Sequence, residues 1–486
     1  MAELILRVTA IGAYFGRWGT EGPGVALISV AEHISTVSVS DSAVRKLENA
    51  RAQSAGEPRR SLGLAATTSI VIGNMVGSGV FLLPASLAAY GVYSLWGWVV
   101  STAGALLLAR VFSRLSRRTP LAGGPYAYPR EVFGDFAGFL LAWMYWVSIA
   151  ASVAAIAVAF ASYSATLVPA LATHPRVGEL AAIAATWLLT GVNILGVRAA
   201  GRLQLITVVL KISPLLVFAL WGIFYFNPHL LAAGATAQSA PAAINATAAL
   251  TMWAFLGLEC ATIPADRVRD PERTIPRATL YGTGIAAVFY ILCTTAVMGI
   301  IPAGALVNSN APFADAAKLV WGGWAGNLIA CAAIISCFGA LNGWILMSGQ
   351  FPQAAARDDL FPKLFDRELE RGTPAAGLIV SSAIATLMIV MNYSRGLVAT
   401  FNVIILIATF FTLVPYMLCS MSELLLGRGE KARGRNIMLA SLPFAFALWA
   451  TAGTGRDSLY WGTLLMLAGL PLYTWQKWRR PDEGRT

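Results

Sequence analysis

The sequence predicts an all-α integral membrane protein with about 12 transmembrane helices, and two observations support that prediction. Of the 486 residues, 57% are hydrophobic and only 12% are charged, and the mean hydropathy is +0.66. Soluble domains are about 45–50% apolar and about 25% charged, so a soluble fold of this length would lack the charge to cover its surface. From Ser61 onward, apolar runs of about 20 residues alternate with short polar breaks, and this is the length that an α-helix needs to cross a bilayer.

Helices are the expected form of these runs because backbone groups in lipid must be satisfied within their own segment. The alternating pattern of outer-membrane strands is absent from the sequence. In chain order, the expected spans are 61–90, 94–116, 136–169, 179–197, 203–226, 244–263, 278–301, 320–355, 374–392, 396–421, 437–453 and 458–476.

Positive charges set the expected orientation. Lys and Arg crowd one set of loops, such as 114–130 and 267–277, whereas the opposite loops carry only scattered cations such as Arg176. The cation-rich side is expected to be cytoplasmic, which places both termini in the cytoplasm and the chain in a bacterial inner membrane. Residues 1–58 contain no span and no signal-peptide pattern, so a disordered cytoplasmic tail is expected there, with a second tail at 481–486.

Residue types that bind metals or act as catalysts are sparse. The three histidines lie outside the apolar runs, and the five cysteines lie within them without a CxxC pair, so no metal, cofactor or disulfide is expected. Cations are not interleaved with aromatic residues as in a nucleic-acid site. An enzyme would need a polar catalytic constellation inside the spans, and a channel would need a charged ring. The sequence shows neither, so we expect no enzyme, no channel and no nucleic-acid partner.

The first span contains an interruption at Gly73–Pro84, which reads GNMVGSGVFLLP. Gly77, Ser78 and Gly79 are poor helix formers, and glycine tolerates the dihedral angles of an unwound turn. Unwinding there would expose the N–H groups of a half-helix beginning at Val80, where the positive end of the helix dipole suits a carboxylate. The alternative is close helix packing, because the stretch also contains a GxxxG pattern.

The sixth span contains a second interruption at Met252–Thr262, which reads MWAFLGLECAT. Gly257 breaks the helix, and Glu259 follows within a turn as the one carboxylate that the sequence places inside a span. A buried ionisable group costs a few kcal/mol, so its presence favours proton or cation binding. The alternative is a neutral glutamic acid that is satisfied by a neighbouring hydroxyl or tyrosine.

Two broken helices predict two repeats of five helices with inverted topology around a site at the middle of the membrane. The membrane domain is expected at 59–480, with repeat one at 61–226, repeat two at 244–421 and extra helices at 437–476. Lys211 is the one basic residue deep in a span. A desolvated lysine can change its charge near neutral pH, which favours coupling or an internal counter-charge over a purely structural contact.

At these residues the chain resembles the amino acid–polyamine–organocation (APC) superfamily, and in particular its basic amino acid/polyamine antiporters. The arginine/agmatine exchangers of that family are most similar, and the ornithine/putrescine exchangers come next. The resemblance covers about 61–476 and rests on both breaks and on motifs such as AGGPYAYPREVFG (122–134), GWILMSGQ (343–350) and TLVPY (412–416). It implies a LeuT-like fold and exchange by alternating access.

The resemblance also implies roles for single residues. The substrate carboxylate would meet N–H groups of the first break, the α-amino group would meet carbonyls of Met75, Trp253 and Leu256, and Trp344 would stack on the aliphatic chain as a middle gate. Trp253 would close the outward path. The implied substrate-binding residues are Asn74, Met75, Gly77, Ser78, Gly79, Trp253, Leu256 and Trp344. The implied gate and proton-coupling residues are Tyr145, Glu259, Tyr416 and Lys211.

Two positions depart from the arginine/agmatine exchangers. Val153 and Ala408 stand where those proteins carry an asparagine and a serine around the guanidinium, and losing such hydrogen bonds is costly for a buried group. Lys211 stands where they carry a small apolar residue, and it resembles the lysine that replaces a sodium ion in proton-coupled permeases of the superfamily.

The expected function is exchange of an arginine-like or other basic amino acid for its decarboxylated amine. The alternative is a proton-coupled or facilitative amino-acid permease with a neutral or broad substrate range. Expected partners are the amino acid and amine substrates, protons and the lipid bilayer, and a homodimer is left open.

Overall fold

The computed structural model describes residues 62–118, 123–173, 175–195, 213–232, 236–263, 265, 268–369, 372–392, 396–427 and 433–479. The tails predicted at 1–58 and 481–486, together with Lys211, lie outside these residues.

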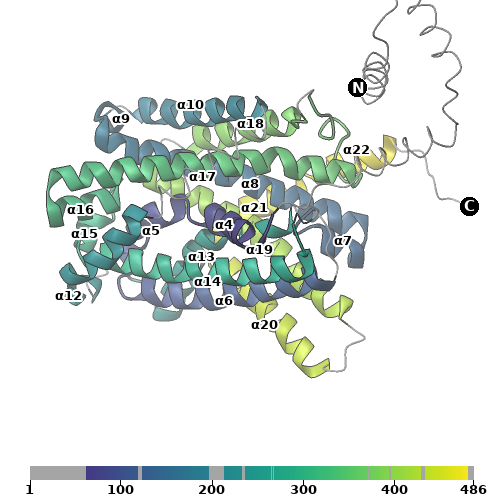
Figure 1. The fold of residues 1–486 in the computed structure, drawn as a ribbon, viewed down its shortest axis with the longest axis horizontal. Coiled ribbons are helices and arrows are strands. Elements are labelled where there is room, and N and C mark those ends of the chain that lie inside the picture. Colours follow the sequence, from purple (N-terminus) through teal and green to yellow (C-terminus); the bar gives the residue numbers. More distant parts are fainter. Residues whose placement is uncertain are drawn as a thin grey trace, which may run out of the picture. The chain divides into compact units, whose positions relative to one another are not determined.

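Regular structure in the described part of the chain is helical, apart from an isolated bridge between Leu62 and Val268 (Figure 1). The elements before the second break are α4 (Leu64–Met75), α5 (Ser78–Leu87), η1 (Ala88–Tyr90), α6 (Tyr93–Arg118), α7 (Ala127–Phe133), α8 (Asp135–Leu167), α9 (Ala170–Thr173), α10 (Pro175–Ile194), the apolar segment Ser213–Tyr225 ending in η2 (Ile223–Tyr225), α12 (Pro228–Ala232) and α13 (Ala240–Met252). The elements from the second break onward are η3 (Trp253–Phe255), η4 (Cys260–Thr262), α14 (Pro271–Met298), α15 (Ala303–Leu306), α16 (Pro312–Trp321), α17 (Gly323–Arg357), α18 (Ala375–Asn392), α19 (Leu397–Leu426), α20 (Arg433–Ala452), α21 (Arg456–Leu467) and α22 (Leu470–Arg479).

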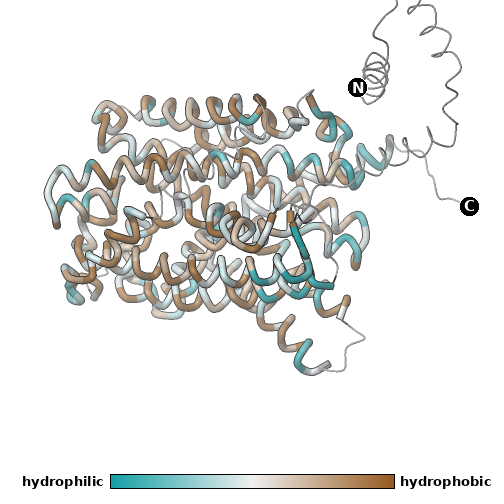
Figure 2. Tube along the Cα trace, viewed as in Figure 1, coloured by the Kyte–Doolittle hydropathy of each residue, from teal (hydrophilic) through white to brown (hydrophobic). Residues whose placement is uncertain are grey.

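Eight of the described helices are long and apolar enough to cross a membrane, or nine if one pair bent by 108° counts as a single span. That pair is Gly434–Ala452 with Arg456–Trp478, and two shorter apolar helices cover Ser213–Tyr225 and Ala375–Met391. Each of the predicted spans overlaps one of these elements, so the all-α membrane fold is confirmed. Figure 2 shows the hydrophobic colour along the long helices and hydrophilic segments gathered toward the end where α7 and α22 lie.

Both predicted interruptions are present. α4 ends at Met75 and α5 begins at Ser78, two residues earlier than the predicted start at Val80. The difference arises because Val76 and Gly77 together make the turn, with Gly77 at φ −128° and ψ −133°, and Ser78 is already helical. In the sixth span, α13 gives way to η3 at Trp253, and Gly257 has a φ of +99°.

Two helix bounds differ most from the prediction, because polar residues were assigned to loops. α14 begins at Pro271, before the predicted start at 278, since proline suits the first turn of a helix. α19 continues to Leu426, beyond the predicted end at 421, and this extension brings Glu423 into the helix.

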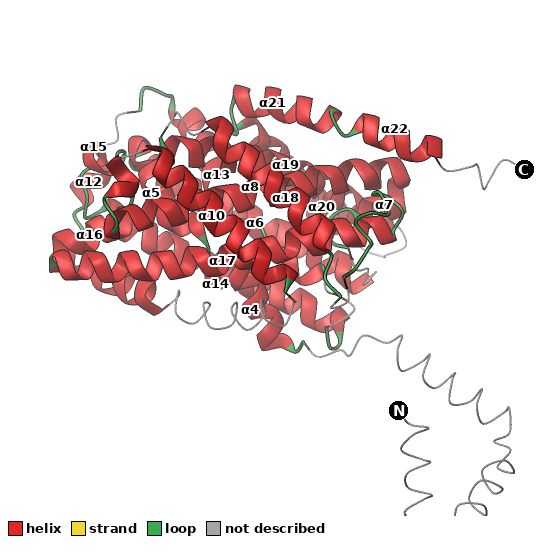
Figure 3. Cartoon of the chain, turned by 90° about the horizontal axis from the view of Figure 1, so that it is seen from above, coloured by secondary structure: helices red, strands yellow, loops and turns green. Residues whose placement is uncertain are grey.

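The helices form two packing groups around the breaks. α6 packs on α13 and α14, and α14 also packs on α4, so this group contains both broken spans. α8 packs on α17, α18, α10 and α19. Figure 1 shows α10 and α18 beside α17 at one edge, with α14 and α6 at the other, and Figure 3 shows α21 and α22 along one side of the helices.

Buried hydroxyl groups join helices within the second group. Pro352 in α17 has no N–H, so it leaves the Ser348 carbonyl without its helical donor. Ser381 Oγ of α18 donates to that carbonyl at 3.0 Å and accepts from Trp146 Nε1 of α8 at 2.8 Å. The helix defect at Pro352 thus becomes a contact among three helices.

Tyr163 of α8 makes a second connection, to the half-helix α5. Its hydroxyl donates to the Phe81 carbonyl at 2.9 Å and accepts from the Phe313 N–H at 3.3 Å, where α16 begins. The Phe81 ring contacts both the Tyr163 ring and the Phe313 ring edge to face. One buried phenol therefore fixes α5 and α16 to the same point on α8.

Candidate functional site

The first break presents unpaired backbone donors. The initial N–H groups of a helix have no partner within it, and Gly77 supplies no side-chain cap for α5. The Gly77 N–H itself donates to the Met75 carbonyl at 2.9 Å, which leaves the next N–H groups, from Ser78 and Gly79, at the open end. This end carries the positive pole of the helix dipole, so it can hold an anionic group.

The second break lies directly against the first. A Cβ added to Gly79 would come within 3.2 Å of Ala254 Cβ and 3.4 Å of Trp253 Nε1. These contacts would be tight, so the lack of a side chain at Gly79 favours this close approach. The Trp253 carbonyl accepts from the Leu256 N–H at 3.1 Å, as the Met75 carbonyl accepts from Gly77. A carbonyl oxygen has two lone pairs, so each can still accept a second hydrogen bond.

Trp344 of α17 spans the space between the two breaks. Its Nε1 donates to the Asn74 carbonyl at 3.2 Å, and its Cζ2 lies 3.7 Å from the place of a Cβ on Gly257. The Asn74 amide donates to Met347 Sδ at 3.5 Å, a weak acceptor, and the Cys260 thiol lies 3.6 Å from the same sulfur. Polar atoms of both breaks thus lie close to the buried indole of Trp344.

Glu259 lies fully buried beside this site. Tyr145 of α8 donates to its Oε1, and Tyr416 of α19 donates to its Oε2. The Phe112 ring of α6 packs edge-on against Tyr416 with the ring centroids 5.1 Å apart, and Phe351 packs on Tyr145 at 4.9 Å. The Glu259 carboxylate thus connects the sixth span to both α8 and α19.

The structure brings together most of the predicted site residues. Asn74, Met75, Gly77, Gly79, Trp253, Leu256 and Trp344 line the two breaks, and Glu259 joins Tyr145 to Tyr416. Of Ser78 the structure describes the backbone alone, and Lys211 lies outside the described residues. The roles given to these residues stay predictions.

Sequence reasoning missed two features of this region. Met347 was not singled out, although it connects Asn74 to Cys260. Glu259 was taken as the only carboxylate inside a span, which is wrong, because Glu423 in α19 is also buried. The one charged residue in SMSELLLG was the signal that could have indicated Glu423.

On the cytoplasmic side of the predicted orientation, polar contacts join α7 to the end of α17. The Tyr126 hydroxyl donates to Asp358 Oδ2 at 2.8 Å, and Arg130 Nη1 lies 3.5 Å from the same oxygen. Burial and the neighbouring Asp358 raise the pKa of the Tyr126 phenol, so it is a neutral donor at physiological pH.

A model of the amino acid permease family matches residues 62–465, which contain both breaks and Glu259. The chain belongs to the amino acid permease family. With its many apolar helices, this permease is an integral membrane protein.

Curated relatives of the permease carry more specific names. A cadaverine/lysine antiporter of Escherichia coli (strain K12) is 36% identical over 364 residues, which cover 74% of this chain and 82% of that protein. The putrescine transporter PotE of the same strain is 32% identical over 420 residues, covering 85% of this chain and 95% of that protein. A solved structure of a manganese transporter from Eremococcus coleocola, in complex with an aromatic bis-isothiourea substituted compound, matches 87% of this chain and 98% of its own at 14% identity and a TM-score of 0.55, a likeness of fold alone.

Proposed function

We propose that this permease exchanges a basic amino acid for its decarboxylated diamine by alternating access, with lysine and cadaverine or ornithine and putrescine as the candidate pairs. The observation that supports this proposal is the pairing of an uncapped helix start at α5 with a buried carboxylate, Glu259, at the adjoining break. The first can hold the carboxylate of an amino acid, and the second can balance the additional positive charge of a diamine. The names of the relatives at 36% and 32% identity agree with this substrate class.

The residues around the breaks suit the head of an amino acid. In the proposed complex, its carboxylate meets the N–H groups of Ser78 and Gly79, and its α-amino group meets the carbonyls of Met75, Trp253 and Leu256. Trp344 covers the aliphatic chain, since an indole offers a large flat face to an alkyl group or a cation.

The far end of the site favours an ammonium over a guanidinium. Val153 and Ala408 are both buried and offer no side-chain hydrogen bond. Nearby, Ser148 Oγ donates to the Ala408 carbonyl at 3.1 Å and lies 2.5 Å from Thr412 Oγ1. A compact ammonium can donate to this small cluster of oxygens, whereas the five donors of a guanidinium would remain partly unpaired. We therefore favour lysine or ornithine over arginine.

Proton coupling and orientation complete the proposal. Intracellular decarboxylation consumes a proton, so amino-acid entry with amine exit exports protons in net effect. Release of Glu259 from Tyr145 and Tyr416 on protonation would connect the opening of the gate to pH.

The cation-rich helix ends, including Arg118 and Arg357, favour a bacterial inner membrane with both termini in the cytoplasm.

Counterflow in proteoliposomes tests exchange directly. Purified protein is reconstituted, and uptake of labelled lysine is measured into vesicles that contain cadaverine, putrescine, agmatine or no substrate. We expect uptake in cadaverine- or putrescine-loaded vesicles at least tenfold faster than in empty ones. Equal uptake into empty vesicles would show a proton-coupled or facilitative permease instead, and preference for agmatine would overturn the assignment of the far end.

A further inference from the structure

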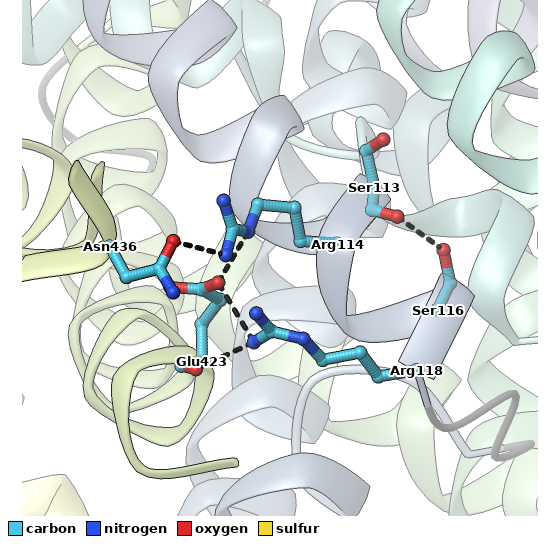
Figure 4. Close-up of polar contacts among 6 residues, drawn as sticks. All are labelled: Ser113, Arg114, Ser116, Arg118, Glu423 and Asn436. Atoms are coloured by element: carbon cyan, nitrogen blue, oxygen red, sulfur yellow. Dashed lines mark hydrogen bonds and ion pairs between the residues drawn. The ribbon is translucent and has the colours of Figure 1, made fainter. Parts of the chain in front are cut away.

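A second buried carboxylate, Glu423, connects three helices near the end of α19. Glu423 is 1% exposed, and its Oε1 lies 2.5 Å from Arg114 Nε and 2.9 Å from Arg118 Nη1, both from α6 (Figure 4). Arg118 also donates to the Glu423 backbone carbonyl at 2.9 Å. Arg114 Nη2 donates to Asn436 of α20 at 2.8 Å. We call Arg114, Arg118, Glu423 and Asn436 the α6–α19 cluster.

Burial distinguishes this cluster from ordinary surface ion pairs. The two arginine side chains are only 16% and 18% exposed. Removing one partner of a buried ion pair leaves an uncompensated charge and is strongly unfavourable, whereas exposed pairs contribute little. The chain also leaves space for the contact, since a Cβ on Gly427 would come within 2.7 Å of Arg118 Nη1. The contact therefore holds one defined arrangement of α6 against α19.

The α6–α19 cluster lies on the same seam as the Glu259 contacts. Tyr416, Ser420 and Glu423 follow one face of α19 at helical spacing, and Phe112 of α6 contacts the Tyr416 ring. Arg114 and Arg118 come next along α6, beyond Phe112. Going along α19 from the site toward its end, the Tyr416–Glu259 hydrogen bond therefore comes first and the contacts of Glu423 with the two arginines come next.

Both contacts also join a helix of one packing group to a helix of the other. α6 packs with α13 and α14, which adjoin the two breaks, whereas α19 packs with α8, which carries Tyr145. A path from the site to the helix ends along this seam can open only when α6 and α19 separate. Glu423 must then lose its two cations, in addition to the loss of the Glu259 hydrogen bond.

We propose that Glu423 is a positioning residue for exchange, which closes the cytoplasmic path in series with Tyr416 and Glu259 through Arg114 and Arg118. This inference rests on the proposed alternating access. A contact that exists only in the closed state shifts the equilibrium toward that state by its own free energy. Neutralising Glu423 therefore increases the population open to the cytoplasm without changing any group that contacts the substrate.

The native Cys419 provides a reporter within about one turn of Tyr416 and Glu423 on α19. It is buried between Tyr416 and Glu423 in the sequence of α19, and its thiol donates to the Pro125 carbonyl at 3.0 Å. With the other four cysteines replaced by alanine, alkylation of Cys419 by N-ethylmaleimide measures how often the seam opens. The readout requires no transported substrate, so a failed counterflow assay leaves it interpretable.

The test compares Glu423→Gln with Asp366→Asn in this background. Asp366 is a matched control because its pair with Arg357 is exposed and lies within one loop and the end of α17. We expect Glu423→Gln to speed Cys419 alkylation at least fivefold and Asp366→Asn to leave it unchanged. Exchanging the charges, with Glu423→Arg and Arg118→Glu together, should restore protection.

Two results would overturn the proposal. One is an unchanged rate of Cys419 alkylation in Glu423→Gln. The other is an equal increase at Cys293, the buried thiol of α14, measured in a protein that retains Cys293 alone, since this would indicate general loosening. Glu423→Asp, which keeps the charge on a shorter side chain, serves if the glutamine variant does not fold, and it should raise alkylation more than twofold at Cys419 and less than twofold at Cys293.

Discussion

Replacing Gly257 by alanine tests the geometry of the second break most directly. Gly257 has a φ of +99°, where an L-residue is strained by about 1–2 kcal/mol. Its new Cβ would also lie 3.3 Å from Cys260 Sγ and 3.4 Å from Asn74 Cβ, both tight contacts. If the free protein relaxes the turn, the ligand must restore it, and the lost free energy appears as an affinity about 5–30-fold weaker.

Gly284→Ala is the matched control for this change. Gly284 lies inside α14, and a Cβ there meets no atom within 4 Å. Alanine in a helix interior stabilises by about 0.5–1 kcal/mol relative to glycine. Lysine binding by scintillation proximity and thermal unfolding in detergent would be measured for both variants. The reasoning is refuted if Gly257→Ala matches Gly284→Ala in affinity and in melting temperature.

Three further substitutions separate the proposed roles. Glu259→Gln keeps the size of the side chain but removes its titratable proton, so we expect exchange in proteoliposomes to lose its pH dependence, and a retained pH profile would contradict the coupling role. Trp344→Leu removes a buried indole and its hydrogen bond and should weaken lysine binding about tenfold or more, whereas Trp324→Leu, on an exposed side chain, should not. Ser381→Ala leaves the Trp146 N–H and a carbonyl of α17 unpaired, so thermal stability should fall by about 1–3 kcal/mol while lysine affinity stays unchanged. A loss of affinity in Ser381→Ala without a loss of stability would contradict that assignment.

The sequence was sufficient for features that arise from local chemistry. Run length and hydropathy predicted the spans because lipid demands about 20 apolar residues of any crossing helix. Gly77 and Gly257 indicated the breaks because glycine forms helices poorly, and Gly257 has the positive φ that glycine adopts at low cost. Glu259 stood out because a carboxylate inside an apolar run is rare.

Contacts between distant segments could not be derived in this way. Neither Tyr145 nor Tyr416 differs locally from an aromatic residue that packs helices, and only the family resemblance indicated that both meet Glu259. Glu423 was placed outside its span because the polar residues near it obscured the end of α19. Its partners lie 305 positions away, at Arg118, or further, at Arg114, and no pattern in one sequence encodes that pairing.

The Tyr163 phenol connects the start of α16 directly to the first break. The half-helix α5 begins at the unpaired N–H groups and is held, one turn later, by the bond from Tyr163 to Phe81. The same oxygen receives the first amide of α16. A ligand that displaces α5 would therefore also shift α16 or break a buried hydrogen bond, because both helices bond to the same Tyr163 oxygen.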